Sequence, residues 1–227
     1  MPCRNEPLVT GEIYHIFNKT IESKEIFKDK TVENLLLDLF GYYKSLKATI
    51  SYSKLKFVDL QIRKQILKNV SESKSFKVEI FCFCLMPTHF HLLLRQKVDN
   101  GIRMFVSDIV NSITKTFNLV NNRTGPIFIP RFKSVRIISE EQLIHVFRYI
   151  HLNPYSSRLI NDFYSLQKYH FSSLIDYVYS YKTHSFVDRD FFLRFFSWDR
   201  EKLKKFIFDQ ADYQRSLEAI KYVEKLI

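Results

Sequence analysis

The sequence predicts an α+β fold of the ferredoxin-like kind: an antiparallel sheet built from a split β-α-β unit, with helices on one face and a C-terminal helical extension. The main observation is the order of hydrophobic periodicities, which runs strand, helix, two strands, helix, strand. The composition agrees, since 46% of the 227 residues are hydrophobic and 26% are charged, as in ordinary globular proteins. A chain of this length forms one domain or slightly more, with a substantial core.

The first part of the chain predicts one strand and two helices. Residues 12–18 alternate as a strand, with Ile13, His15 and Phe17 on one face. Thr31 is placed to cap a helix over about 32–51. A second helical pattern covers 57–70, and a polar loop follows at 71–75.

The middle of the chain predicts the other three strands. Residues 77–85 and 89–96 are expected to be adjacent strands, followed by a helix at 102–120, a turn at 121–126 and a fourth strand over 128–138. Residues 140–153 are expected to be helical, because their apolar residues recur at helical spacing. Pro154 should end this helix, since the residue before a proline avoids the α region.

The C-terminal part of the chain is aromatic-rich from Ser173 to Trp198 and amphipathic from about Arg200 to Ile227. The amphipathic stretch is expected either to pack on the body of the protein or to form an oligomer contact. A homodimer is therefore left open.

Two histidines stand out in the second half of the predicted hairpin. Side chains in a strand alternate between faces, so His89 and His91 point the same way while Phe90 and Leu92 point the other way. Two imidazoles side by side form half of a rigid metal site. The alternative is that the two histidines are structural, which is common for an isolated pair of this kind.

A second candidate cluster lies on the predicted helix at 140–153. His145, Tyr149 and Asn153 form a separate row at i, i+4, i+8, at the edge of the buried stripe. Asn153 can offer an amide oxygen to a metal, one turn after the phenol of Tyr149. The alternative is a half-buried aromatic residue and an asparagine near a helix end.

Five ordered blocks resemble the single-tyrosine HUH transposases, and most closely their REP-associated tyrosine transposase branch (the IS200-like transposase domain). The blocks are Tyr14-His15-Ile16-Phe17-Asn18, then residues 85–94 with the His-Phe-His triplet, then Gly125-Pro126 through Arg131-Phe132-Lys133-Ser134, then Tyr149-Ile150-His151-Leu152-Asn153-Pro154, and Tyr169-His170-Phe171-Ser172-Ser173. The resemblance covers roughly residues 11 to 175. It implies a catalytic domain at 1–175 with a helical insertion at about 54–75, and leaves 176–227 as the extension.

The resemblance also implies the chemistry. Tyr149 would be the nucleophile that forms a 5′-phosphotyrosine on single-stranded DNA and releases a 3′-hydroxyl. His89 and His91 would hold Mg²⁺ or Mn²⁺, and Asn153 would complete or orient that site. His15 could face the same surface as a neighbour of the ligands.

The chain departs from the pattern of this family in three places. Tyr155 stands where a small aliphatic residue is expected, so it is an alternative nucleophile. Ile129-Pro130 replaces a Gln-Gly pair, and residues 115–118 lack an expected tyrosine. The last two departures put the target DNA sequence in doubt more than the chemistry.

The charge distribution favours a polyanionic partner, with 35 Lys and Arg against 24 Asp and Glu. Between residues 109 and 139 there is no acidic residue, and phenylalanines are interleaved with basic residues, a mixture that can follow a phosphate backbone and stack on bases. The resemblance implies that the partner is single-stranded or hairpin DNA. The candidate DNA-binding residues are Lys115, Arg123, Arg131, Lys133, Arg136 and Arg148. The alternative is that these basic residues form a solvent-exposed surface that binds no partner.

Other classes of protein are disfavoured. Four scattered glycines cannot form a phosphate-binding loop, and no apolar run is long enough to cross a membrane. Cys82 and Cys84 are expected to be reduced thiols of a cytoplasmic, nucleoid-associated protein. A zinc site of Cys82, Cys84, His89 and His91 is a remote alternative, because zinc sites usually space their cysteines further apart.

The function predicted is a metal-dependent single-stranded DNA endonuclease and strand transferase, acting in transposition or in the processing of REP-like hairpins. The first alternative is a domesticated, non-catalytic binder of structured nucleic acid. The second is hydrolysis by a metal-activated water.

Overall fold

The computed structural model describes residues 7–216, which form a four-stranded antiparallel sheet covered by helices on both faces. The strands are β1 (Ile13–Lys19), β2 (Val78–Met86), β3 (His89–Gln96) and β4 (Lys133–Arg136), in the order β2-β3-β1-β4. Every neighbouring pair is antiparallel. This is the order that two interleaved β-α-β units produce, so the predicted α+β fold class is confirmed. The helices, however, lie on both faces of the sheet and not on one face as predicted, because α4 packs against β2 and β3 on the face opposite α1 and α3.

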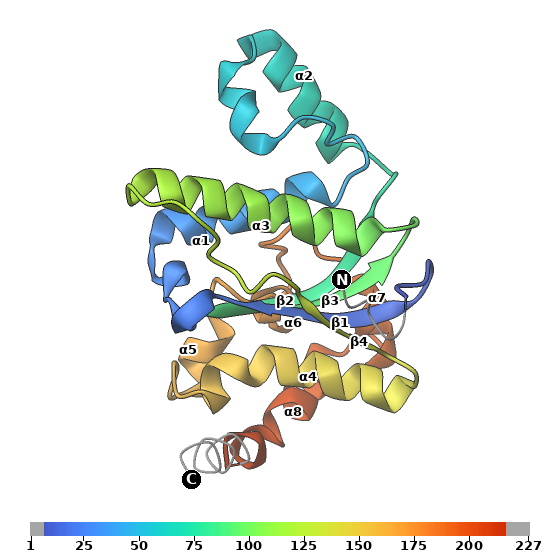
Figure 1. The fold of residues 1–227 in the computed structure, drawn as a ribbon. Helices are drawn as coiled ribbons and strands as arrows, with labels where there is room; N and C mark the ends of the chain where they lie inside the picture. Colours follow the sequence, from blue (N-terminus) through green and yellow to red (C-terminus); the bar gives the residue numbers. More distant parts are fainter. Residues whose placement is uncertain (1–6, 217–227) are drawn as a thin grey trace.

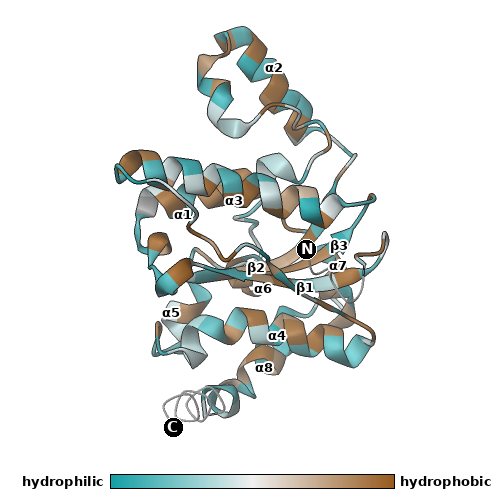
Figure 2. Cartoon of the chain, in the orientation of Figure 1, coloured by the Kyte–Doolittle hydropathy of each residue, from teal (hydrophilic) through white to brown (hydrophobic). Residues whose placement is uncertain are grey.

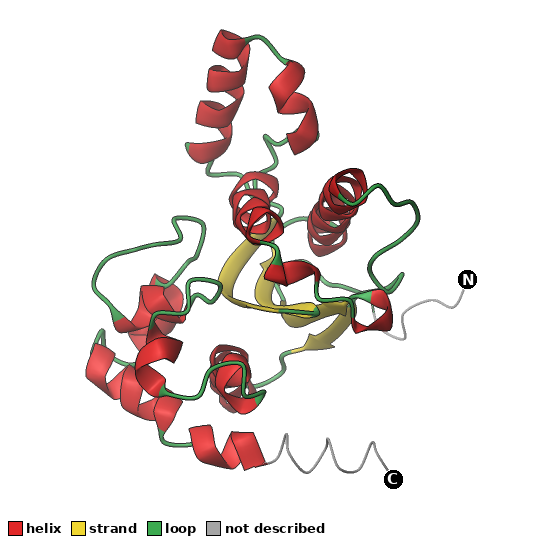
Figure 3. Cartoon of the chain, turned by 90° about the vertical axis from the view of Figure 1, so that its left-hand side faces the viewer, coloured by secondary structure: helices red, strands yellow, loops and turns green. Residues whose placement is uncertain are grey.

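The helices form two layers (Figure 1). α1 (Lys30–Tyr43) and α3 (Gly101–Val120) cover one face, as the split β-α-β arrangement requires. The opposite face is covered by α4 (Glu140–Ser156) and by the segments that follow it (Figures 1 and 3). These are α5 (Phe163–Gln167), α6 (Leu174–Val178), α7 (Asp190–Phe195) and α8 (Arg200–Phe208).

The predicted helix at 32–51 begins earlier and ends earlier than expected. Asp29 rather than Thr31 is the cap, and its carboxylate accepts a hydrogen bond from the backbone N–H of Thr31 at 2.8 Å. The helix ends at Tyr43 because the backbone then turns to pair with residues 75–77. Three short helical turns flank these elements: η1 (Ile21–Ser23), η2 (Ile26–Lys28) and η3 (Tyr52–Phe57).

The helical pattern predicted at 57–70 is present as α2 (Leu60–Ser71). Asp59 caps it by accepting hydrogen bonds from the N–H groups of Gln61 and Ile62. With η3, it projects from the α1/α3 layer (Figures 1 and 3). Val70 is its buried residue, so little of this segment contributes to the core.

The fourth strand is shorter than the predicted 128–138. Phe128 and Ile129 pair with the end of β1, but pairing then stops and resumes at β4. Pro130 has no N–H to donate, which breaks the ladder at this edge of the sheet. The predicted amphipathic C-terminal stretch begins as α8, and its residues 217–227 lie outside the described part of the chain.

Pro154 does not end α4, contrary to the prediction from the sequence. The helix continues to Ser156 with the proline inside it. Because Pro154 cannot donate to the carbonyl of Ile150, that carbonyl needs another partner. The side-chain Nδ2 of Asn153 lies 3.5 Å from the Ile150 oxygen and donates to the Tyr149 oxygen at 2.9 Å. The asparagine amide therefore supports the backbone at the proline.

The core lies on both faces of the sheet. Phe83, Phe90 and Leu92 are fully buried toward α1 and α3, while Phe147 and Ile150 of α4 are buried on the opposite side. Phe147 stacks on Phe192 of α7, with ring centroids 4.1 Å apart, so the stretch beyond residue 175 shares the same packing. In Figure 2, hydrophobic and hydrophilic residues alternate along α3 and α4, as expected for half-buried helices. No helix within residues 7–216 is long and apolar enough to span a membrane.

Candidate active site

Strand register places both histidines of the His-Phe-His triplet on the face that α4 covers. His91 pairs with Phe17 of β1 and with Cys84 of β2. His89 pairs with Lys19 and Met86. Paired residues in antiparallel strands point to the same side, so His15, Phe17 and Lys19 also face α4.

Between this face and α4 lies a cavity of about 220 Å³. Ten residues line it: His15, Phe17, Lys19, Met86, His89, His91, Tyr149, Asn153, Ser156 and Ser157. The predicted metal ligands and the predicted nucleophile therefore meet in one place, although they are separated by about 60 residues in the chain. The ring of Tyr149 is edge-on to the rings of His91 and His15, with centroids 5.8 and 6.0 Å apart.

His91 is held by His15. Nε2 of His15 lies 2.9 Å from Nδ1 of His91, and both rings are buried. Burial lowers the pKa of His15 to about 4. Burial, together with the nearby His15, His89 and Lys19, lowers the pKa of His91 well below its usual value. Both imidazoles are therefore neutral at pH 7, which is the form that binds metals.

His89 is oriented in the same way by its neighbour in the chain. Nδ1 of His89 lies 2.9 Å from the hydroxyl of Thr88. A hydrogen bond to Nδ1 presents Nε2 for coordination, and metal-bound histidines usually have such a partner. The rings of His89 and His91 have centroids 5.0 Å apart, and each is engaged through Nδ1.

Asn153 has a fixed amide orientation. Its Nδ2 donates to the carbonyls of Tyr149 and Ile150, so Oδ1 is on the opposite side of the amide, as the acceptor. Two neutral imidazoles and one amide oxygen are a donor set suited to a divalent ion that keeps open positions. The residues present thus fit Mg²⁺ or Mn²⁺, the ions implied by the resemblance.

Tyr155, the alternative nucleophile, lies elsewhere. It is buried, and its hydroxyl donates to Asp212 at 2.7 Å while its ring packs against Phe163. It is not among the residues that line the cavity. Its contacts are those of a packing residue that joins α4 to the C-terminal helices.

The predicted basic residues do not all lie together. Lys133 pairs with Phe17, so it is in the same row of the sheet as His91 and is exposed at its edge. Lys115 and Arg131 are also exposed. Arg123 donates to the Asn118 side chain and the Pro126 carbonyl, and Arg136 forms an ion pair with Glu12 at 3.1 Å.

Arg148, which the sequence analysis places among the candidate DNA-binding residues, lies against α8. Its guanidinium donates to the carbonyl of Phe206 and lies 4.6 Å from the centre of the Phe206 ring. It also contacts Nδ1 of His145 at 2.7 Å. These contacts give Arg148 a role in packing the C-terminal helix.

One basic residue of the cavity was missed from the sequence. Lys19 is exposed and lines the cavity beside His89. The signal was available, because Lys19 continues the alternation of His15 and Phe17 on the first strand. The basic residues expected to bind DNA lie between positions 115 and 148, so none of them is on β1.

The zinc site considered from the sequence is not formed. Cys82 and Cys84 are free and fully buried, and Cys82 lies opposite Leu93 rather than near His89. Within residues 7–216, no group of three or more His, Cys, Asp or Glu side chains is placed to hold a metal. A set of two histidines and an asparagine is a different kind of site from such a group.

The structure is similar to that of a REP-associated tyrosine transposase bound to a REP hairpin. The TM-score is 0.53, the sequences are 15% identical, and the match covers 78% of this chain and 86% of that chain. At this identity the likeness shows the fold alone. The sequence itself matches no protein-family profile and no curated protein.

Proposed function

We propose that the protein is a metal-dependent single-stranded DNA endonuclease and strand transferase that acts through a 5′-phosphotyrosine intermediate. The observation that carries the proposal is the meeting of Tyr149, His89, His91 and Asn153 in one cavity. The fold shared with a tyrosine transposase that binds a DNA hairpin supports the same function. Processing of a REP-like hairpin or transposition of a DNA segment would both use this chemistry.

Each residue has a defined role in the proposed reaction. Tyr149 attacks the phosphorus, so that its O–P bond forms while the O3′–P bond breaks and O3′ leaves as a hydroxyl. When bound by His89, His91 and Asn153, Mg²⁺ or Mn²⁺ would supply positive charge to the phosphate. Tyrosine ionises near pH 10 in water, so nearby positive charge is needed for it to react at neutral pH. Lys19 lies in the same cavity and contributes such charge.

The phosphotyrosine bond stores the energy of the broken phosphodiester. The freed 3′-hydroxyl, or another one, can attack it and rejoin strands without ATP. Met86 and Phe17 also line the cavity, so part of its wall is apolar.

The test is incubation of the protein with hairpin-bearing single-stranded oligonucleotides and Mn²⁺, followed by denaturing electrophoresis. We expect a covalent protein–DNA band that Tyr149→Phe abolishes and the matched control Tyr155→Phe retains. A band that survives in Tyr149→Phe would contradict the assigned nucleophile. Products with a 5′-phosphate and no adduct would instead identify water as the nucleophile.

The non-catalytic alternative predicts a different pattern. Hairpin binding would then be independent of metal and unchanged in a His89→Ala/His91→Ala double variant, with no adduct under any condition. The proposed enzyme requires that this double variant lose adduct formation and Mn²⁺ binding together.

A further inference from the structure

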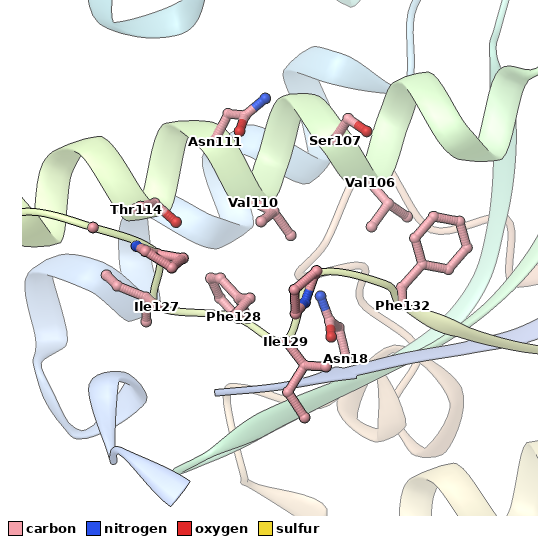
Figure 4. Close-up of a pocket in the computed structure, with 13 residues that line it drawn as sticks. Asn18, Val106, Ser107, Val110, Asn111, Thr114, Ile127, Phe128, Ile129 and Phe132 are labelled. Atoms are coloured by element: carbon pink, nitrogen blue, oxygen red, sulfur yellow. The ribbon is translucent and has the colours of Figure 1, made fainter. Parts of the chain in front are cut away.

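A second cavity, of about 340 Å³, lies on the other face of the sheet from the tyrosine cavity (Figure 4). One wall is α3, where Val106 and Val110 point toward the space. The other wall is the segment 125–132, whose Phe132 ring turns toward α3. The floor is Asn18 of β1, which points from the strand toward α3. This volume is at the lower end of the range for small-molecule sites.

Asn18 presents an unused hydrogen-bond donor to this cavity. Its side chain is 4% exposed, and its Oδ1 accepts a hydrogen bond from the backbone N–H of Lys19 at 3.0 Å. That bond fixes the orientation of the amide and directs Nδ2 to the other side. Nδ2 donates to none of residues 7–216. Because Nδ2 is not fully enclosed, it opens onto the cavity and can donate to an acceptor atom of a ligand there.

The lining of the cavity carries no charge, whereas its surroundings are basic. The polar residues of the lining are neutral: Asn18, Ser107, Asn111 and Thr114. Phe132 is half-buried and lines the cavity with its aromatic side chain. Lys115 directly follows Thr114, and Arg131 directly follows Pro130, and both basic residues are exposed. A neutral, partly aromatic pocket with cations at its rim suits a nucleobase inside and phosphates outside.

The two cavities share one short stretch of β1. Phe17 and Lys19 line the tyrosine cavity, and Asn18 between them lines the second one. Lys133, next to Phe132 in the chain, lies at the edge of the sheet on the face of the tyrosine cavity, and the exposed Arg131 lies on the segment that lines the second cavity. A strand held at Tyr149 therefore has a route of basic residues around this edge.

We propose that the second cavity binds one unpaired nucleobase of the same DNA strand that the tyrosine cavity holds. The inference rests on the proposed function, and it names the substrate feature that positions the strand. Asn18 donates to an acceptor on the base edge, and Phe132 stacks on its face. Lys133 and Arg131 contact the phosphates that lead to it.

The experiment measures the affinity of the full chain for labelled DNA hairpins with single-stranded flanks, in EDTA so that no cleavage occurs. Flanks of different base composition are used, and an abasic residue is placed at each flank position in turn. One position should stand out, with a loss of affinity of roughly 5- to 150-fold, since stacking on an aromatic residue contributes that much per base. Other flank positions should show small and even losses.

The matched variants are Val110→Phe, which fills the cavity, and Leu119→Phe, which adds the same kind of bulk at an exposed position on the same helix. The Val110→Phe variant should bind the hairpins weakly. An abasic residue at the distinctive flank position should no longer reduce its affinity. Leu119→Phe should keep the profile of the parent protein. A Val110→Phe variant with the parent profile would overturn the assignment.

A cross-linking measurement does not depend on any variant. With 5-iodouracil at each flank position, light should cross-link the distinctive position to residues 125–132, as mapped by mass spectrometry. A flat abasic profile, or cross-links only to the tyrosine cavity, in a protein that still forms the phosphotyrosine adduct overturns this inference alone. A protein that binds none of the hairpins overturns the proposed function as well.

Discussion

Nε2 of His15 faces Nδ1 of His91 at a distance of 2.9 Å. The hydrogen-bond partner of His91 therefore comes from β1, whereas His89 and His91 are both on β3. If His91 coordinates through Nε2, its Nδ1 carries the proton and donates it to His15. His15 then sets both the tautomer and the ring orientation of His91. We therefore expect His15 to act as a positioning residue and not as a ligand.

Replacing His15 should weaken metal binding without unfolding the protein. We expect His15→Phe to raise the Kd for Mn²⁺ by about 10- to 100-fold, as for other partners of metal-bound histidines. His15→Gln, which retains an acceptor, should recover part of the loss. Calorimetric titration measures both, with His145→Gln at the exposed start of α4 as the control. Equal Mn²⁺ affinity in the parent and in His15→Phe would contradict this role.

Asn153→Asp should have opposite effects on metal binding and on folding. The added charge should tighten Mn²⁺ binding, but a carboxylate cannot donate to the carbonyls of Tyr149 and Ile150, which Asn153 does now. Without metal we expect a loss of about 1–3 kcal/mol in the free energy of unfolding. Mn²⁺ should therefore raise the Tm of Asn153→Asp more than that of the parent, in thermal unfolding followed by circular dichroism. Identical metal-free Tm values would show that the amide donor is not needed.

The salt dependence of hairpin binding should separate two basic residues. If Lys133 neutralises a phosphate, Lys133→Ala should reduce the slope of log K against log salt concentration by about 0.7. Arg148→Ala should leave the slope unchanged and lower the Tm, because Arg148 packs on Phe206. Fluorescence anisotropy over a range of salt concentrations gives the slopes. A reduced slope in Arg148→Ala would mean that α8 moves when DNA binds.

The two buried thiols should be unreactive in the folded protein. Burial raises the pKa of Cys82 and Cys84, so each stays protonated as the pH rises through 8, where an exposed thiol of pKa about 8.5 begins to ionise. In a Cys3→Ser variant we expect no fast reaction with a disulfide reagent at pH 8 and reaction of both thiols after unfolding in urea. Fast reaction in the folded state would show that the β2 face opens.

Two glycines in helices should respond oppositely to alanine. A Cβ at Gly101 would lie 2.2 Å from the carbonyl oxygen of Lys77, which is backbone and cannot move aside. A Cβ at Gly41 would make an ordinary contact at 3.6 Å with Phe186. Gly101→Ala should destabilise the protein by several kcal/mol, on the order of the largest effects of single substitutions. Gly41→Ala should stabilise it by up to about 1 kcal/mol. Denaturant unfolding compares the two.

The sequence predicted best those features that depend on a hydrophobic pattern extending over many residues. Strand and helix order, the shared face of His89 and His91, and the row of Tyr149 and Asn153 all follow from side-chain periodicity alone. The misplaced boundaries depend on tertiary contacts, as at Pro154, where a side-chain amide replaces a missing backbone donor. The position of Arg148 could not be predicted either, because its partner Phe206 is distant in the chain. Asn18 offered no sequence signal, since its cavity forms only when α3 and the 125–132 segment meet.

Phe17, Asn18 and Lys19 point alternately to the two faces of the sheet. Both cavities therefore depend on the register of the single strand β1. A shift of one residue in β1 would turn Asn18 toward the histidines and send Phe17 and Lys19 toward α3. Both cavities would then be lost together, although each residue type would still be present. Pairing on both sides, with β3 and with β4, prevents that slip. Insertions and deletions should therefore be tolerated in the α2 segment but not within β1.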